Sequence, residues 1–215
     1  KMKIVSLILA RGGSKGIPRK NIIDINGKPL LAYTIQASLD SVVNETWVST
    51  DCAEIKLVAK KYSAQVIDRP LELAEDTSQS EDALLHFAMN YDFDILVFIQ
   101  PTSPLLSADY INEGINILLK NHNFDSVCSV YKEHWIPRWE LNGKPYNWNI
   151  NNRPRRQDES EKYVENGAFY ITSRKKLMES KLRYSGKIAF VEMPMSKSFQ
   201  IDTLDDLELI KRIIK

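Results

Sequence analysis

Cysteine is scarce in this sequence, with two among 215 residues. Cys52 and Cys128 lie far apart, and neither belongs to a CxxC pair or to a Cys/His spacing. This argues against a structural zinc site, a redox motif and a disulfide framework, and it favours a reducing cytoplasm as the compartment. Histidine is equally sparse, and His86, His122 and His134 lack any spacing to a partner ligand, so we expect them on the surface or in packing contacts.

Long apolar runs are also missing. No segment reaches the roughly 18 apolar residues of a membrane-spanning helix, and the apolar run at residues 4–9 (IVSLIL) is too short for the core of a signal peptide. We therefore expect a protein that is neither secreted nor embedded in a membrane.

Charge of one sign is not in excess, because 29 Lys and Arg stand against 28 Asp and Glu, a net charge of +1. The overall electrostatic field therefore offers no long-range attraction to nucleic acid or to an anionic membrane. Any anion that this protein binds must be held by a local cluster. The sequence also lacks a GxSxG nucleophile turn, a Walker A loop and a GxGxxG loop, which excludes the commonest hydrolase and nucleotide signatures.

What the sequence does contain is an alternation of strand-like and helix-like segments. Hydrophobic residues make up 43% of the chain, enough for a core in one domain spanning residues 1–215. The alternation predicts an α/β fold of Rossmann-like type, with a mostly parallel sheet covered by helices on both faces. Strands are expected at 3–10, 46–50, 64–67, 94–99, 125–130, 167–172 and 187–192, a loop at 11–29, and helices at 30–39, 54–62, 80–90, 109–120 and 203–214.

Two of these segments carry further detail. In the last helix, Thr203 and Asp206 fit a capping box, and Leu204, Leu207, Ile210 and Ile214 are expected to form its buried stripe. Residues 131–165 interrupt the alternation with Trp135, Trp139 and Trp148, an Asn-Gly turn and the basic run Arg153–Arg156. We interpret them as a small β-rich arm whose tryptophans are covered in an interface, because so short an arm cannot cover large aromatic side chains by itself.

The segment LARGGSKGIPRKN, from Leu9 to Asn21, is the most informative of the chain. Its glycines let backbone N–H groups turn inward, and Arg11, Lys15, Arg19 and Lys20 place cations directly after the first buried strand. Loops after parallel strands open on the carboxyl edge of the sheet, where α/β folds bind ligands. The pattern favours a polyphosphate site, with a basic surface loop as the alternative.

This segment resembles the N-terminal signature of the acylneuraminate cytidylyltransferases, the synthetases of CMP-sialic acid and related nonulosonic acids. The resemblance continues in the same order along the chain through STD (49–51), the stretch from Arg69 to Ser78, QPTSP (100–104), NGAFYI (166–171) and IDTLDDLE (201–208). It implies an enzyme that transfers CMP from CTP to the anomeric hydroxyl of a nine-carbon 2-keto sugar acid, such as sialic, legionaminic or pseudaminic acid, releasing pyrophosphate. It also implies a homodimer and a Mg²⁺ cofactor.

Carried over residue by residue, the resemblance implies catalytic roles for Arg11, Lys15 and Asp202, with Asp202 as the Mg²⁺ ligand. The nucleotide-binding residues that it implies are Leu9, Ala10, Arg11, Gly12, Gly13, Ser14, Lys15, Lys20, Asn21, Arg69, Ser78 and Ser80. Gln100, Arg156 and Tyr170 are similar to residues that contact the sugar acid, Arg156 from the neighbouring subunit. A guanidinium suits a carboxylate because it can bind both oxygens.

Several alternatives stay open. Ser78 and Ser80 can equally cap the following helix, Asp51 can cap a loop rather than approach the nucleotide, and Asp202 can serve as a charge at a helix N-terminus. Relatives often read Asp-Ile-Asp where this chain has Gln200-Ile201-Asp202, so either one metal suffices or phosphates and the sugar carboxylate hold a second. They also usually have a Leu-Pro pair near residues 158–162 (DESEK). The rival functions are a CMP-Kdo synthetase, another sugar nucleotidyltransferase, and a non-catalytic nucleotide-binding protein.

Overall fold

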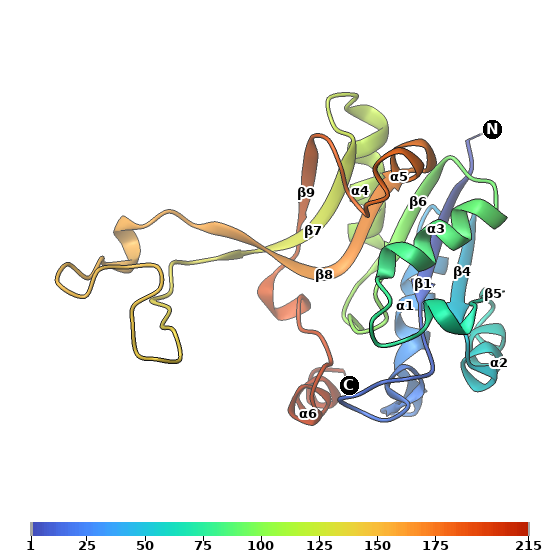
Figure 1. The fold of residues 1–215 in the computed structure, drawn as a ribbon, viewed down its shortest axis with the longest axis horizontal. Helices are drawn as coiled ribbons and strands as arrows, with labels where there is room; N and C mark the ends of the chain where they lie inside the picture. Colours follow the sequence, from blue (N-terminus) through green and yellow to red (C-terminus); the bar gives the residue numbers. More distant parts are fainter. Residues whose placement is uncertain (1, 215) are drawn as a thin grey trace.

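The structure, a computed structural model, describes residues 2–214 and has a seven-stranded sheet in the order β5-β4-β1-β6-β8-β7-β9 (Figure 1). The strands are β1 (Ile4–Leu9), β4 (Glu45–Thr50), β5 (Gln65–Asp68), β6 (Ile95–Ile99), β7 (Ser126–Glu133), β8 (Lys162–Ser173) and β9 (Ile188–Glu192). All neighbours are parallel except β8, which runs antiparallel to β6 and β7. The predicted mostly parallel α/β sheet is confirmed.

Helices cover both faces of this sheet, as predicted. They are α1 (Leu30–Leu39), α2 (Ala53–Lys61), α3 (Ser80–Asn90), α4 (Ala108–Lys120), α5 (Arg174–Ser180) and α6 (Leu204–Ile213). Alternate residues of β1 point to opposite faces: Ile4 and Ile8 pack with α1, α2 and α4, whereas Val5 and Leu7 pack with α3 and α5. This alternation of side chains on a fully buried strand explains why β1 is apolar almost throughout.

Three local predictions need correction. The predicted loop 11–29 contains the short hairpin of β2 (Asp24–Ile25) and β3 (Lys28–Pro29). Helix α5 was not predicted, because its sequence has no stripe of apolar residues at helical spacing. Leu177 alone of its residues is buried. In α6 the capping box of Thr203 and Asp206 is confirmed, but Leu204 is 62% exposed, because α6 meets its small core only through its later turns.

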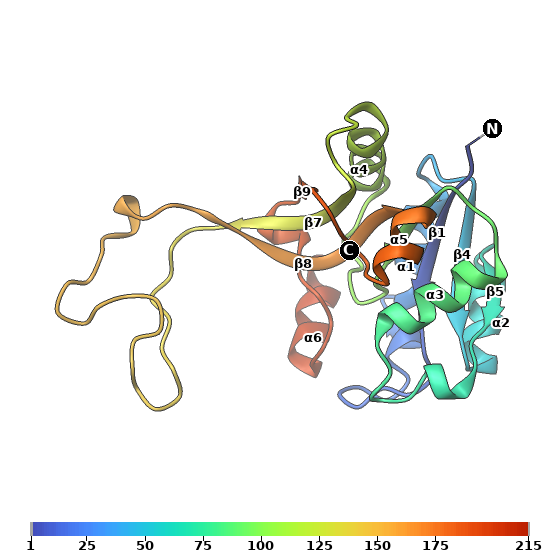
Figure 2. The same cartoon turned by 45° about the horizontal axis from the view of Figure 1, so that its top comes forward.

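The predicted arm projects from the sheet in both ribbon views (Figures 1 and 2). Its base is a two-stranded ribbon, in which Val130–Glu133 of β7 pairs with Lys162–Glu165 of β8. Within the described residues 134–161, β structure is limited to isolated bridges between Trp139 and Pro145 and between Asn149 and Asn152. The arm is therefore β-structured at its base and irregular toward its tip. No helix in the described part of the chain is both long and apolar enough to cross a bilayer.

Candidate active site

Four parallel strands end at the same edge of the sheet. β1 leads into the loop of residues 10–19, β4 into Asp51, β5 into Arg69 and β6 into Gln100. β8 runs antiparallel to these strands, so residues from its first half reach the same edge. There the backbone N–H of Gln100 donates to the Ala168 carbonyl at 3.1 Å. The residues of the separate sequence motifs therefore meet at one place, as the carboxyl-edge rule predicts.

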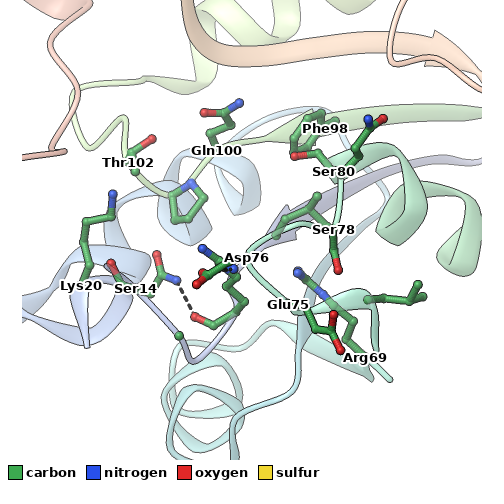
Figure 3. A pocket seen from close by; sticks show the side chains of 17 residues that line it. Ser14, Lys20, Arg69, Glu75, Asp76, Ser78, Ser80, Phe98, Gln100 and Thr102 are labelled. Carbon is green, nitrogen blue, oxygen red and sulfur yellow. Dashed lines mark hydrogen bonds and ion pairs between the residues drawn. The ribbon is translucent and has the colours of Figure 1, made fainter. Parts of the chain in front are cut away.

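A cavity of about 320 Å³ opens at this edge (Figure 3). Its lining includes ten of the predicted site residues: Leu9, Arg11, Gly13, Ser14, Lys20, Asn21, Arg69, Ser78, Ser80 and Gln100. The others that line it are Leu73, Glu75, Asp76, Gln79, Phe98, Pro101 and Thr102. The predicted residues outside this lining are Ala10, Gly12, Lys15, Arg156, Tyr170 and Asp202.

The loop after β1 is held in shape by neighbouring side chains. The Gly12 amide donates to Oδ1 of Asp51 at 2.8 Å, and Nδ2 of Asn21 donates to the Arg11 carbonyl at 3.0 Å. Asp51 therefore caps this loop, which is one of the two roles that the sequence leaves open for it. Because both ends of the loop are tied, its amides and cations are arranged before any ligand binds.

Asp202 lies directly against this loop. A Cβ added to Gly16 would stand 2.8 Å from the Asp202 carbonyl oxygen, so a larger residue at 16 would push the two segments apart. The Asp202 carboxylate accepts a hydrogen bond from Nζ of Lys20 at 3.0 Å. The helix-capping role falls to Thr203 and Asp206 instead. The loop after β1 and the segment around Asp202, which lie near opposite ends of the sequence, therefore meet in the fold.

Arg11 and Lys15 share one acidic partner, Asp76, which the sequence had not singled out. Nη1 of Arg11 is 2.9 Å from Oδ1 of Asp76 and Nζ of Lys15 is 3.1 Å from Oδ2. The hydrogen bond from Lys15, together with the charge of Arg11, lowers the pKa of the Asp76 carboxyl below its usual range. Asp76 is therefore ionised at neutral pH and faces two cations.

Arg69 is a buried cation in the wall of the cavity. Its Nε donates to Oγ of Ser49 at 3.0 Å and its Nη2 donates to the Ser49 carbonyl at 2.8 Å. Burial lowers the pKa of the guanidinium to about 10, opposed by the charge of Asp51 and aided by that of Arg11. Arg69 nevertheless stays protonated at neutral pH, so it supplies a fixed positive charge to the wall of the cavity.

Ser78 and Ser80 line the same cavity as Arg69 (Figure 3). Oγ of Ser78 donates to the Glu72 carbonyl at 2.8 Å, which closes the turn before α3. The cap of α3 is Gln79, paired with Asp82, so neither serine is the capping residue. This leaves Ser80, the first residue of the helix, with its side chain at the cavity.

Gln100 lines the part of the cavity that faces β8. Gln100 and Gln200 both lie beside Gly167, where an added Cβ would be 3.4 Å from Oε1 of Gln100 and would collide with Nε2 of Gln200. Gly167 also has a φ of +67°, a backbone conformation that favours glycine. The amide of Gln200 donates to Oγ of Ser103 at 3.4 Å, so it is turned toward this side rather than toward Asp202's partner Lys20.

Tyr170 lies behind the cavity wall rather than in it. Its ring stacks on Phe98, a lining residue, with the centroids 5.6 Å apart. Its hydroxyl donates to Glu165 at 3.0 Å, and burial together with the Glu165 charge raises its pKa. In the described chain Tyr170 therefore supports the wall through Phe98.

Arg183, which no sequence motif singles out, lies beside these rings. Its guanidinium lies 5.3 Å from the Phe98 centroid and 5.1 Å from that of Tyr170. It also binds both carboxylate oxygens of Glu81, at 2.6 and 3.0 Å. Since Glu81 follows Ser80, this ion pair joins the start of α3 to the wall.

Arg156 is not brought to the cavity within one chain. It is exposed on the arm and lines a separate hollow there with Trp135, Ile136 and Pro137. Its neighbours are occupied locally: Arg155 pairs with Asp158 at 2.6 Å, and Arg153 lies 5.4 Å from the Trp148 ring. Arg156 therefore lies apart from the cavity at the sheet edge, in a hollow of the arm.

Comparison with known proteins now decides the family. The model of the family described as cytidylyltransferase matches residues 5–215, essentially the whole chain. The chain belongs to the cytidylyltransferase family. The cavity at the carboxyl edge is the candidate active site of this family member.

Two relatives of this cytidylyltransferase family member differ in length. N-acylneuraminate cytidylyltransferase B of Danio rerio is 43% identical over 205 residues, covering 92% of this chain and 48% of that protein. The chain therefore spans about half the length of that relative. Pseudaminic acid cytidylyltransferase of Campylobacter jejuni is 32% identical over 225 residues, covering 100% of this chain and 97% of that protein.

A solved structure agrees with the fold of this cytidylyltransferase family member. A CMP:2-keto-3-deoxy-manno-octonic acid synthetase in complex with CTP superimposes with a TM-score of 0.77 and covers 99% of this chain and 98% of the other. The two sequences are 19% identical, so the likeness concerns the fold. It agrees with the Rossmann-like sheet that the strand and helix pattern predicted.

Proposed function

We propose that this protein transfers CMP from CTP to the anomeric hydroxyl of a nonulosonic acid and releases pyrophosphate. The observation that carries the proposal is a cluster of paired charges at one cavity: Arg11 and Lys15 both pair with Asp76, Lys20 pairs with Asp202, and Arg11, Lys20 and Asp76 line the cavity. The names of relatives that act on acylneuraminate and pseudaminic acid support the same reaction.

In this proposal the nucleotide binds along the loop after β1. Arg11, Lys15 and the tied amides of the loop hold the triphosphate, while Arg69 and Ser80 lie where cytosine and ribose would enter the cavity. The arrangement of cations is made before binding, which lowers the cost of ordering charged groups around a ligand.

The reaction itself needs little covalent work from the protein. The anomeric oxygen attacks the α-phosphorus, its proton passes to solvent, and the bond from that phosphorus to the bridging oxygen of pyrophosphate breaks. Negative charge develops on the departing pyrophosphate, and fixed cations near it stabilise the transition state. Lys15, an exposed residue in the middle of the loop, is the residue that we assign to this charge, together with Arg11, which shares its partner Asp76.

Mg²⁺ is the cofactor that we propose for this site. Among residues 2–214, no group of three or more His, Cys, Asp or Glu could hold a metal unaided. Mg²⁺ is commonly held by one or two carboxylates with phosphate oxygens and water, so the single carboxylate of Asp202 fits an ion that binds together with CTP. When bound, the ion supplies positive charge to the phosphates. Lys20 balances Asp202 in the ligand-free chain.

We further propose that the protein is a homodimer in which the arm reaches a second subunit. Apolar side chains gather on the arm with large exposed fractions: Ile136, Trp139, Leu141, Tyr146 and Ile150. Exposed apolar groups of this kind mark interaction surfaces. The arm would then deliver Arg156 to the partner's acceptor site. Sedimentation should give a dimer, and replacing Trp139 and Leu141 by serine should give a monomer.

The acceptor assay tests the reaction. Protein, CTP and Mg²⁺ are mixed with sialic, legionaminic, pseudaminic and eight-carbon Kdo-type acids, and pyrophosphate release is measured. We expect release with a nine-carbon acid and its loss when EDTA removes Mg²⁺. Turnover with the eight-carbon acid alone would contradict the proposed acceptor class. Silence with every acid while CTP still binds would favour a nucleotide sensor.

The proposed compartment is the cytoplasm. The thiols of Cys52 and Cys128 are both free in the described chain, which fits a reducing environment. Cell fractionation with an antibody to the protein checks this expectation.

A further inference from the structure

Asp76 belongs to a segment that crosses the mouth of the candidate active site. The segment, residues 70–79, joins β5 to α3 and is fixed at both ends. The Arg69 amide donates to the Thr50 carbonyl at 2.8 Å, and Gln79 caps α3 with Asp82. Between these anchors, the Ala74 carbonyl accepts from Nη1 of Arg11 at 3.3 Å, and Asp76 pairs with Arg11 and Lys15. We call residues 70–79 the strap.

The partners of Asp76 are the two cations that the proposed reaction assigns to the triphosphate. Both carboxylate oxygens are used, one on Arg11 at 2.9 Å and the other on Lys15 at 3.1 Å. Carboxylate and phosphate oxygens are acceptors of the same kind for guanidinium and ammonium groups. Asp76 therefore occupies hydrogen-bonding positions on Arg11 and Lys15 that a phosphate would also use.

The bridging pairs are suited to exchange. Side chains of Lys15 and Asp76 are 75% and 45% exposed, and exposed ion pairs contribute only about 0–1 kcal/mol each. The neighbouring Ser78 is tied to Glu72 within the strap itself. A phosphate chain could therefore replace the Asp76 carboxylate by movement of side chains and the strap, with the sheet unchanged.

We propose that Asp76 is a specificity-determining residue that competes with the ligand's phosphate oxygens for Arg11 and Lys15. This inference rests on the proposed function, because it takes these cations as the triphosphate site. A polyphosphate replaces both contacts of the carboxylate at once, whereas a nucleoside without phosphates replaces neither. Asp76 thereby makes binding depend on the polyphosphate and takes back the cations once pyrophosphate has left.

Calorimetry with matched variants tests the competition. Wild type, Asp76→Asn and Glu75→Gln are titrated with CTP and with inorganic pyrophosphate in EDTA, and cytidine binding is followed by NMR. Asn keeps the size of the side chain and removes its charge, so both anions should bind about three- to tenfold more tightly to Asp76→Asn. Cytidine binding should not change. Asp76→Glu keeps a carboxylate and should restore affinities near those of the wild type.

Glu75→Gln is the control for general charge. Glu75 also lines the cavity and adjoins Asp76, but no ion pair to Arg11 or Lys15 is present for it in the described chain. Its neutralisation should tighten anion binding by less than about twofold. Equal gains in the two variants would overturn the inference, because the effect would then be one of net charge. Thermal unfolding of each variant checks that the fold is retained.

The remaining outcomes separate the inference from the proposed function. Unchanged or weaker pyrophosphate binding in Asp76→Asn overturns the inference alone. Weaker CTP binding seen only when Mg²⁺ is added would make Asp76 a metal ligand and also overturns it. If no acceptor is turned over but Asp76→Asn binds CTP more tightly, the proposed reaction is contradicted and the competition by Asp76 is supported. A wild type that binds neither CTP nor pyrophosphate overturns both.

Discussion

The residues that the proposed reaction assigns to the nucleotide are held differently from those that it assigns to the acceptor, and we call the two groups the nucleotide side and the acceptor side. On the nucleotide side, the loop after β1 is tied to Asp51, Asn21 and Asp202 by contacts within one chain. On the acceptor side, Gln100 alone of the predicted residues lines the cavity. Tyr170 lies behind Phe98, and Arg156 is out on the arm.

This difference teaches that the two substrates make different demands on the chain. The folded chain holds the nucleotide groups in position by itself, because they follow the ends of adjacent parallel strands. One of the residues assigned to the acceptor, Arg156, is on the arm. The arm has few contacts with the core, so the position of Arg156 depends on what covers the arm. We therefore expect variants on the two sides to affect separate kinetic parameters.

The largest effect is expected for Lys15→Ala. Loss of a fixed cation near the departing pyrophosphate should reduce kcat by about 10²- to 10³-fold, as for other lost transition-state donors. Steady-state kinetics with saturating acceptor measures it. Arg19→Ala is the matched control, because Arg19 belongs to the same loop but pairs with Glu54. Near-normal turnover in Lys15→Ala would remove this residue from the chemistry.

Arg156→Ala is expected to have a smaller effect, and this effect should be on the KM of the acceptor rather than on CTP. Loss of a guanidinium from the acceptor carboxylate should raise the acceptor KM by about tenfold or more, since hydrogen bonds to charged groups contribute about 1.5–3 kcal/mol. The Kd of CTP, measured by calorimetry, should not change. Arg155→Ala serves as the comparison, because Arg155 is already paired with Asp158. Weaker CTP binding in Arg156→Ala would contradict the division into two sides.

Asp51→Ala tests how the nucleotide side is held in shape. The variant leaves the Gly12 amide without its acceptor, which should weaken CTP binding by about fivefold to tenfold, or about 1 kcal/mol. Asp51→Asn keeps an acceptor oxygen and should lose less. Calorimetry with CTP measures both variants. An acceptor KM that rises in Asp51→Ala while CTP affinity stays normal would count against the tie.

The smallest effect is expected for Tyr170→Phe. The change removes the hydroxyl that donates to Glu165 and keeps the ring that supports Phe98. Unfolding free energy should fall by about 1 kcal/mol, whereas the acceptor KM should stay within about twofold of wild type. Denaturant melts and acceptor kinetics check the two parts. A large rise in KM would show that the hydroxyl reaches the acceptor directly.

Much of the fold could be predicted because apolar residues recur at helical or strand spacing. Helices 30–39 and 80–90 have the predicted bounds, and their predicted inner residues, such as Ile35 and Phe87, are buried. Prediction from residue spacing fails where tertiary packing decides which side chains are buried. Leu204 has the spacing of the buried stripe but lies at the exposed end of α6, and α5 buries Leu177 alone.

The candidate site divides in the same way. Residues 9–21 form one continuous motif, so their meeting with Asp51 and Arg69 could be expected from strand order. Asp76, Phe98 and Arg183 reach the site through tertiary packing, and no local pattern marks them. The strap contains three acidic residues, Glu72, Glu75 and Asp76, and the sequence does not distinguish the one that pairs with the basic loop.

Mixed dimers test the central claim most directly, namely that one subunit holds the nucleotide while its partner's arm completes the acceptor side. Lys15→Ala and Arg156→Ala chains, each expected to keep about a tenth or less of wild-type activity alone when the acceptor concentration is below KM, are unfolded together, refolded as a mixture and assayed under that condition. If Arg156 acts across a two-fold interface, each mixed dimer regains one intact site, and the mixture should recover about a quarter of wild-type activity. No recovery, despite mixed dimers proven by mass spectrometry, would contradict the account.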